Sequence, residues 1–228
     1  MIAANRAGVS SAHTSMEAFG STLVVASRRF DRRIAADGRV ERVHQEDACQ
    51  ALSILTLSPE RKYQRHSPSL SLVAISRLLD QWAEPRSLDE LLTHLTFNVL
   101  IGNADYHGKN ISFLHERDGA VRVAPLYDAM STVYYSGTDD LPPVDTELGL
   151  YVSKKSNIND VTVTDLVDEA GRWGMRRQRS VSLIADLVER LPIAFDDAIN
   201  EVESAPDRLL ELIRSRIATV AGDLVRLK

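Results

Sequence analysis

The chain has 228 residues, and 44% of them are apolar, enough to build the core of one large or two small domains. A net charge of −5 argues against a surface coated by nucleic acid, and 6% aromatic residues give little support to a base-stacking platform. The single cysteine, Cys49, excludes an internal disulfide. No stretch approaches twenty apolar residues and no signal pattern opens the chain, so we predict a cytoplasmic protein without a membrane span.

The first third of the chain predicts short elements separated by turns. Residues 1–20 predict a short helix and a loose connection, and the apolar run Thr22–Ala26 is typical of a strand. The Asp37-Gly38 turn leads to a returning strand over 40–43. We expect a helix over 45–52, with Glu46 and Asp47 in its first turn. A second helix is expected over 70–82, with Trp82 on the side that faces the core.

A long core helix is predicted after Pro85. Ser87-Leu88-Asp89-Glu90 has the form of a capping box, so we expect the helix to begin there. Leucines and one valine then recur at helical spacing and predict one buried face: Leu88, Leu91, Leu92, Leu95 and Val99. Gly102 suits the helix C-terminus, where a left-handed residue is often needed.

Two carboxylates and an amide are expected to converge beyond this helix. A polar loop carries Asp105 and Asn110, and residues 111–114 and 121–124 predict two short strands. Because such a hairpin returns the chain to its starting point, Asp128 should lie near Asn110 and Asp105.

The last part of the chain predicts a polar segment and then helices. Met130–Ile158 is the expected flexible segment, because it has two prolines, two glycines and many polar residues. We expect Thr164 to cap a helix over 165–173, with Trp173 in the core. Further helices are predicted over 180–190, 193–202 and, after Ser204-Ala205-Pro206-Asp207, up to Leu224.

This arrangement suits phosphoryl transfer. One carboxylate can deprotonate an attacking hydroxyl, while an amide and a second carboxylate hold Mg²⁺ on the phosphates of ATP. Protein kinases separate the Asp and the Asn of their catalytic loop by four residues, and Asp105 and Asn110 have that spacing.

The stretch Leu100–Asn110, followed by Ala124-Pro125-Leu126-Tyr127-Asp128, resembles the kinase core of the HipA family, the toxin kinases of bacterial toxin–antitoxin pairs. Three upstream stretches stand in the order that this family uses: Arg29-Phe30-Asp31-Arg32, His44-Gln45-Glu46-Asp47 and Lys62-Tyr63. The resemblance is strongest from about residue 23 to residue 132. It implies an α-rich α+β fold, a protein-kinase-like C-lobe with small β-hairpins.

The resemblance also implies site roles. Asp105 would be the catalytic base, Asn110 and Asp128 the Mg²⁺ ligands, and Arg28, Arg29 and Phe30 the hinge that contacts the adenine of ATP. Arg28 stands where the family often has Glu, so the contacts expected at this position are those of the backbone.

Two loop residues keep two interpretations each. We place Lys109 with the catalytic residues, neutralising a transferring phosphate, against a solvated loop lysine. His107 is placed with the cofactor-binding residues, and it either hydrogen-bonds the loop or a carboxylate, or joins a metal site with Asp105 and Asp128. Near the hinge, Arg29, Arg32 and Arg33 are expected to pair with Asp31 and other carboxylates.

By this resemblance, residues 1–44 would be a remnant of the N-lobe and the hinge, and 45–228 a helical C-lobe with catalytic loop 103–110 and metal motif 124–128. HipA-like kinases carry a phosphate-binding loop and an ATP-contacting lysine before the hinge, and no lysine precedes Phe30 here. We therefore expect that the chain begins partway through a kinase domain. The reason would be an incorrectly assigned start, a gene remnant, or a split kinase whose N-lobe is a separate chain.

The family further suggests an aminoacyl-tRNA synthetase as the protein substrate and a HipB-like DNA-binding antitoxin as a partner, with no direct nucleic-acid contact. Three alternatives stay open. The first is a catalytically inactive C-lobe that acts as a binding or regulatory module. The second is a phosphoinositide-type lipid kinase, although its metal motif usually ends in Asp-Phe-Gly where Tyr127-Asp128-Ala129 stands here. The third is a metal-dependent hydrolase using Asp105, His107 and Asp128.

Overall fold

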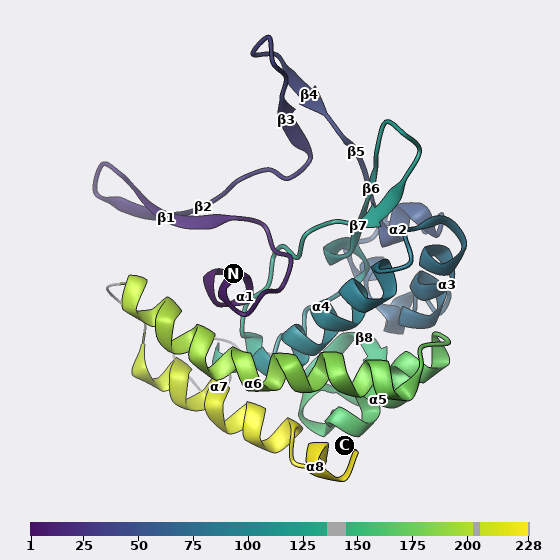
Figure 1. Ribbon diagram of the computed structural model, residues 1–228, viewed down its shortest axis with the longest axis vertical. Coiled ribbons are helices and arrows are strands. Elements are labelled where there is room, and N and C mark those ends of the chain that lie inside the picture. Colours follow the sequence, from purple (N-terminus) through teal and green to yellow (C-terminus); the bar gives the residue numbers. More distant parts are fainter. Residues whose placement is uncertain (136–144, 203–205, 228) are drawn as a thin grey trace.

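The computed structural model describes residues 1–135, 145–202 and 206–227 (Figure 1). Residues 136–144, which belong to the expected flexible segment, lie outside the described residues. No helix in the described part of the chain is both long and apolar enough to cross a membrane.

A body of packed helices carries the core. Its longer helices are α3 (Leu72–Trp82), α4 (Ser87–Ile101), α5 (Val163–Arg172), α6 (Arg177–Glu201) and α7 (Asp207–Val220), and its short ones are α1 (Ile2–Arg6), α2 (Ala48–Ala51) and α8 (Leu224–Leu227). Helix α4 is central, because it packs against α3, α5, α6 and α7 and is buried at nearly every position from Leu91 to Ile101. A helix apolar on all sides belongs in a core.

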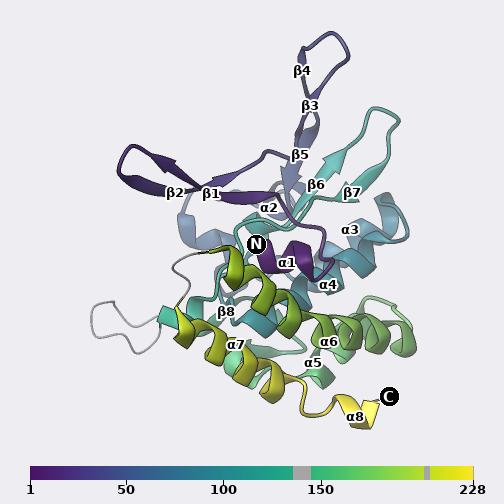
Figure 2. The ribbon, with the colours of Figure 1, turned by 60° about the vertical axis from the view of Figure 1, so that its left-hand side comes forward.

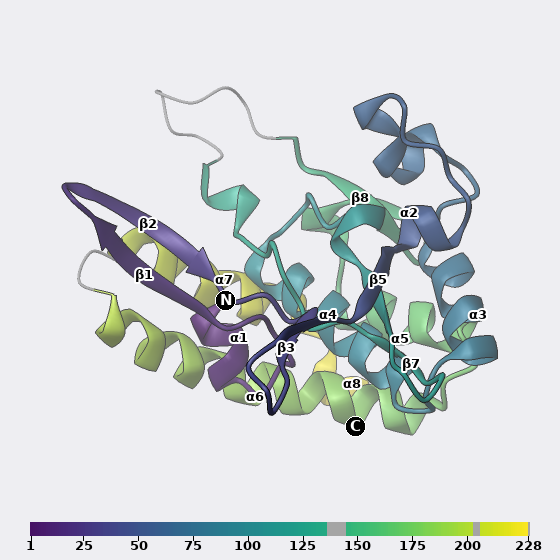
Figure 3. The same cartoon turned by 90° about the horizontal axis from the view of Figure 1, so that it is seen from above.

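Four small antiparallel sheets accompany this body in the described part of the chain. They are the hairpins β1 (Thr14–Phe19) with β2 (Thr22–Ser27), β3 (Arg32–Ile34) with β4 (Val40–Arg42) and β8 (Glu147–Val152) with β9 (Lys155–Asn157), and the sheet β5 (His44–Asp47), β6 (Ser112–His115), β7 (Val121–Val123). The first two hairpins project away from the helices in two directions (Figure 2). Seen from above, the β1–β2 hairpin and helix α3 lie at opposite sides of the body (Figure 3).

The predicted strands at 22–26, 40–43, 111–114 and 121–124 are confirmed within a residue or two. Strand β1 falls in the segment predicted to be a loose connection, and it forms because a tight turn at Gly20 (φ +62°) folds it back onto β2. The β8–β9 hairpin was likewise not predicted.

The helix predicted over 45–52 is wrong in its first half. Residues 44–47 form strand β5, which pairs with β6 from a distant part of the chain, so tertiary pairing overrides the local helical pattern. The helix α2 begins only at Ala48, with Asp47 as its cap in a capping box with Gln50.

Three predicted caps and helix ends also change. Ser87 is the first residue inside α4 rather than its cap, because the turn at Glu84–Arg86 already has near-helical geometry and Ser87 donates its N–H to the Glu84 carbonyl. Thr162, not Thr164, caps α5. Helix α6 runs through Pro192 as one helix instead of two.

The predictions for the last helix and for the two tryptophans are confirmed only in part. The amphipathic helix predicted up to Leu224 ends at Val220, and Leu224 starts the separate α8. Trp82 is 64% exposed, against the prediction of a core residue, whereas Trp173 is buried as predicted. The division of the chain at residue 44 stays a prediction.

Candidate active site

The loop that follows α4 is fixed by its own hydrogen bonds. Gly102 adopts the left-handed conformation (φ +72°) and ends the helix, as predicted. The hydroxyl of Thr132 donates to the Gly102 carbonyl at 3.1 Å and accepts from the N–H of Ala104 at 2.9 Å. The side chain of Asn103 then accepts from the N–H of Asp105 at 3.1 Å, so the turn into the expected catalytic loop is fixed on both sides.

Strand β8 closes the other side of this loop. The N–H of Gly149 donates to the Ala104 carbonyl at 2.8 Å. A Cβ atom at Gly149 would lie 2.7 Å from the carbonyl oxygen of Tyr106 and 3.0 Å from the Cα of His107, both backbone atoms. Glycine is therefore required here by the close approach of two backbones.

Asp105, the expected base, has two aromatic neighbours. The hydroxyl of Tyr63 donates to Oδ1 of Asp105 at 2.7 Å, and Nε2 of His107 lies 3.9 Å from Oδ2. The Asp105 side chain is 47% exposed, so it is held in place while it stays open to solvent. Burial, and then the bond to Asp105, raise the pKa of Tyr63, so this phenol remains a donor.

His107 is the buried centre of the site. Its ring packs edge-on against Tyr63, with 5.3 Å between the ring centroids, and its Nδ1 has no hydrogen-bond partner among the described residues. Burial lowers the pKa of His107, while Asp105 and, more weakly, Asp128 oppose that shift. The Asp105 carboxylate is therefore the nearest negative charge that the structure records beside this imidazole.

Asn110 and Asp128 meet as predicted. The amide nitrogen of Asn110 lies 3.3 Å from Oδ2 of Asp128 and 3.5 Å from its carbonyl oxygen. Asn110 is buried and Asp128 is exposed. Asp128 has a φ of +54°, a conformation that non-glycine residues rarely adopt and that often marks functional positions.

The side chain of Lys109 forms an ion pair with Asp47. Its ammonium lies 2.6 Å from the carboxylate of Asp47, so it is paired rather than freely solvated. This ion pair connects the loop to the end of strand β5.

A hydrogen-bonded relay ties the loop to the hinge. Gln45 donates to the hydroxyl of Ser112 at 3.0 Å, which lies 2.6 Å from the hydroxyl of Tyr127. Tyr127 in turn donates to the carbonyl of Lys109 at 2.6 Å. Its ring lies 5.6 Å from that of Phe30, which brings this predicted hinge residue to the site.

The two hinge arginines do not join the cluster. Among the described residues, neither Arg28 nor Arg29 forms a side-chain bond to Asp105, Asn110 or Asp128. Arg29 instead makes two bonds to Asp31, at 2.8 and 2.6 Å, and holds the pKa of that carboxyl below its usual range. The predicted pairing with Asp31 is confirmed for Arg29 and Arg32, and Arg33 pairs with Glu116.

Sequence reasoning gave no role to Tyr63, Tyr127, Ser112 or Gln45. Three of these residues lie in stretches that carried the family resemblance, which was the signal available. What the sequence did not show is that a strand and an irregular segment would bring their polar groups to the loop.

A pocket of about 910 Å³ opens beside Asp128. Its walls come from the β1–β2 hairpin, the segment Tyr127–Met130 and helices α6 and α7. Volumes of this order are typical of cofactor sites.

The helical body, the small sheets and the loop–hairpin arrangement define a kinase-like fold. Residues 1–195 match the HipA-like C-terminal domain, and the chain belongs to that family. Relatives of this chain have kinase names. Y4mE of Sinorhizobium fredii is 32% identical over 174 residues (74% of this chain, 39% of the relative), and the serine/threonine-protein kinase toxin HipA of Shewanella oneidensis is 28% identical over 204 residues (84% and 45%). The chain thus spans less than half the length of each.

Two solved structures have a similar fold. HipA from the Shewanella oneidensis complex of HipA, HipB and operator DNA superposes with a TM-score of 0.79 at 25% identity, covering 99% of this chain and 54% of that one. The Helicobacter pylori proinflammatory kinase CtkA gives a TM-score of 0.58 at 15% identity, over 98% and 81% of the two chains, which supports the fold alone.

Proposed function

We propose that this chain carries the catalytic centre of a HipA-like serine/threonine protein kinase, which transfers the γ-phosphate of ATP to a protein hydroxyl. The observation that carries the proposal is the contact of 3.3 Å between Asp128, which follows strand β7, and Asn110, which lies on the same loop as Asp105. The catalytic-loop spacing of Asp105 and Asn110 and the membership in a family with kinase relatives agree with it.

The residues present fit a magnesium site. Asp128 offers carboxylate oxygens. Asn110 offers an amide oxygen once its side-chain amide rotates, because its amide nitrogen faces Asp128 in this structure. Mg²⁺ prefers such oxygen ligands. When bound there, Mg²⁺ would neutralise charge on the phosphates of ATP. The left-handed backbone of Asp128 turns its exposed carboxylate beside Asn110, which supports these two residues as the ligands.

Asp105 is the proposed base. The substrate hydroxyl oxygen attacks the γ-phosphorus, the bond from that phosphorus to the β–γ bridging oxygen breaks, and ADP leaves. The hydroxyl proton passes to the Asp105 carboxylate, which Tyr63 orients through its 2.7 Å hydrogen bond. Burial of His107 lowers its pKa, which disfavours a competing positive charge beside Asp105.

ATP is proposed to bind between the hinge and Asp128. Phe30 and Tyr127 would bound the adenosine, with backbone contacts from residues 28–30. The pocket of about 910 Å³ adjoins this position through Tyr127 and Asp128, while Phe30 and Asn110 lie outside its walls. For Lys109 to neutralise a transferring phosphate, its ammonium has to leave the carboxylate of Asp47. In this scheme residues 1–44 and 45–228 would form the hinge side and the C-lobe.

A solved relative supports a partner for this chain, and the family resemblance suggests a substrate. The related HipA was solved with HipB and operator DNA, which supports a HipB-like antitoxin as a partner of this chain. The family resemblance suggests an aminoacyl-tRNA synthetase as the phosphorylated protein.

The proposal is tested by phosphotransfer. The chain is incubated with Mg²⁺, ATP labelled at the γ-phosphate and a candidate synthetase, and phosphoserine and phosphothreonine are measured. Asp105→Asn is expected to reduce transfer by roughly 10²- to 10⁴-fold. Asp118→Asn, in the β6–β7 turn, is the matched control and should retain activity. Absence of transfer by the unaltered chain, or equal transfer by Asp105→Asn, would contradict the proposal, and the former would favour the binding-module alternative.

A further inference from the structure

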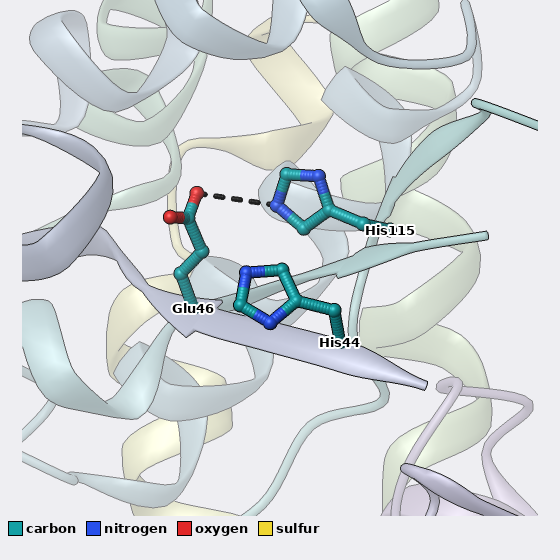
Figure 4. A group of neighbouring side chains, drawn as sticks. All are labelled: His44, Glu46 and His115. Carbon is teal, nitrogen blue, oxygen red and sulfur yellow. Dashed lines mark hydrogen bonds and ion pairs between the residues drawn. The ribbon is translucent and has the colours of Figure 1, made fainter. Parts of the chain in front are cut away.

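Two histidines and a glutamate gather on one face of the β5–β6 sheet, away from the proposed kinase centre. His44 and His115 are direct partners on the two antiparallel strands. Glu46 lies two residues beyond His44, and side chains two apart on a strand point to the same face. Figure 4 shows the carboxylate of Glu46 directed at the ring of His115, with the ring of His44 beside both.

The distances suit a single metal ion. One ligand atom from each of the three residues lies within 4.8 Å of the other two. Ligands at about 2.0–2.1 Å from a tetrahedral zinc ion lie roughly 3.4 Å from one another. Oε2 of Glu46 and Nε2 of His115 are already 3.1 Å apart. Only His44 has to move to close the set, and because it is exposed its ring can turn without disturbing the core.

The surroundings leave room for a further ligand. The side chains of Glu46 and His115 are 33% and 35% exposed, and both line a pocket of about 310 Å³. The other walls of this pocket are mostly apolar and include Trp82 and Phe113. A metal held by three protein ligands would therefore keep an open position beside an apolar surface, the pattern of an accessible rather than a closed site.

We propose that His44, Glu46 and His115 form a binding site for a divalent transition metal of the zinc type. Two imidazole nitrogens and one carboxylate oxygen suit Zn²⁺ and its neighbours, whereas Mg²⁺ prefers oxygen ligands alone. The site is separate from the pair Asn110 and Asp128, and it does not rest on the proposed kinase activity.

A metal at this site would link strand β5 to strand β6, next to the loop that carries Asn110. Strand β5 ends at Asp47, which pairs with Lys109 of the loop, and strand β6 begins two residues after Asn110. A metal bridging the two strands ties together the segments that flank the loop. Because only the folded chain brings the three residues together, the metal also stabilises the folded state.

The test uses the chain without a histidine tag and titrates it with Zn²⁺ in a calorimeter, in buffer free of phosphate and chelators. We expect one Zn²⁺ per chain, and binding at least about tenfold weaker in His44→Ala and in His115→Ala. His13→Ala removes another exposed imidazole and is the matched control. Asp128→Ala separates this site from the proposed magnesium site. Both controls should bind Zn²⁺ as the unaltered chain does.

The outcomes are decisive. If the unaltered chain binds no Zn²⁺ up to about 0.1 mM, or if His44→Ala binds as tightly as His13→Ala, the three residues form only a hydrogen-bonded cluster and the proposal is overturned. Loss of binding in Asp128→Ala alone would also overturn it, because the metal would then lie at the other site. His44 is exposed, so its variant should fold, and circular dichroism checks this independently of the metal.

Discussion

Replacing Gly149 with alanine tests how the expected catalytic loop is held. The added methyl group would lie 2.7 Å from the carbonyl oxygen of Tyr106 and 2.9 Å from its carbonyl carbon. Since both are backbone atoms, no flexible side chain can move aside. Strand β8 has to shift away from the loop, which would strain the hydrogen bond of 2.8 Å from Gly149 to Ala104.

Overpacking of a buried contact costs about 1–3 kcal/mol. For a chain of this size, each kcal/mol lowers Tm by about 2–4 °C, so we expect Gly149→Ala to melt about 2–12 °C lower. Differential scanning calorimetry measures the shift. Because the strain falls on Tyr106 and His107, beside Asp105, phosphotransfer should decrease more than stability alone explains.

The control is Gly171→Ala in helix α5. A Cβ atom there meets nothing within 4 Å, and alanine in a helix is about 0.5–1 kcal/mol more favourable than glycine. We therefore expect opposite signs, a lower Tm for Gly149→Ala and an equal or higher one for Gly171→Ala. An unchanged Tm in Gly149→Ala would refute the inferred contact between β8 and the loop.

Two further predictions concern the pH dependence of stability and the orientation of the Asp105 carboxylate. Burial lowers the pKa of His94 from 6.5 to about 4, so on acidification the unfolded chain takes up this proton before the folded chain does. The free energy of unfolding therefore falls by about 3 kcal/mol as the pH drops from 6.5 to 4. Urea unfolding across this range should show a smaller pH slope for His94→Gln, whose amide can still donate to the Ser10 carbonyl. Tyr63→Phe removes the hydrogen bond to Asp105 and should lower kcat about tenfold with little change in Mg-ATP affinity.

Specific results would contradict the predictions for His94 and Tyr63. Equal pH slopes in the unaltered chain and His94→Gln would mean that another group controls acid stability. A Tyr63→Phe variant with full kcat, or one that loses Mg-ATP binding instead, would remove Tyr63 as the residue that orients the base.

The local part of the candidate site was predictable from sequence. The leucine spacing of α4, its end at Gly102 and the short hairpin after Asn110 each depend on neighbouring residues. Together they were enough to bring Asp128 back to Asn110, as the 3.3 Å contact confirms.

The remaining features depend on partners far apart in the chain. Gln45 lies in a stretch with a helical pattern, yet it forms a strand because β6 offers hydrogen bonds to it. Tyr63 lies in an irregular segment whose path no periodicity describes, so its bond to Asp105 was not foreseen. The same holds for the pairing of His44 with His115, which only the register of β5 and β6 reveals.

The central claim is that Asp128 holds the metal of ATP while Asp105 acts on the substrate. Calorimetric titration of Mg-ATP into the unaltered chain, Asp128→Ala and Asp105→Asn tests it most directly. We predict micromolar binding, on the order of 10 μM, for the unaltered chain, at least about tenfold weaker binding for Asp128→Ala, and affinity within about twofold for Asp105→Asn. No binding up to about 1 mM ATP, or equal binding by the unaltered chain and Asp128→Ala, would contradict the account.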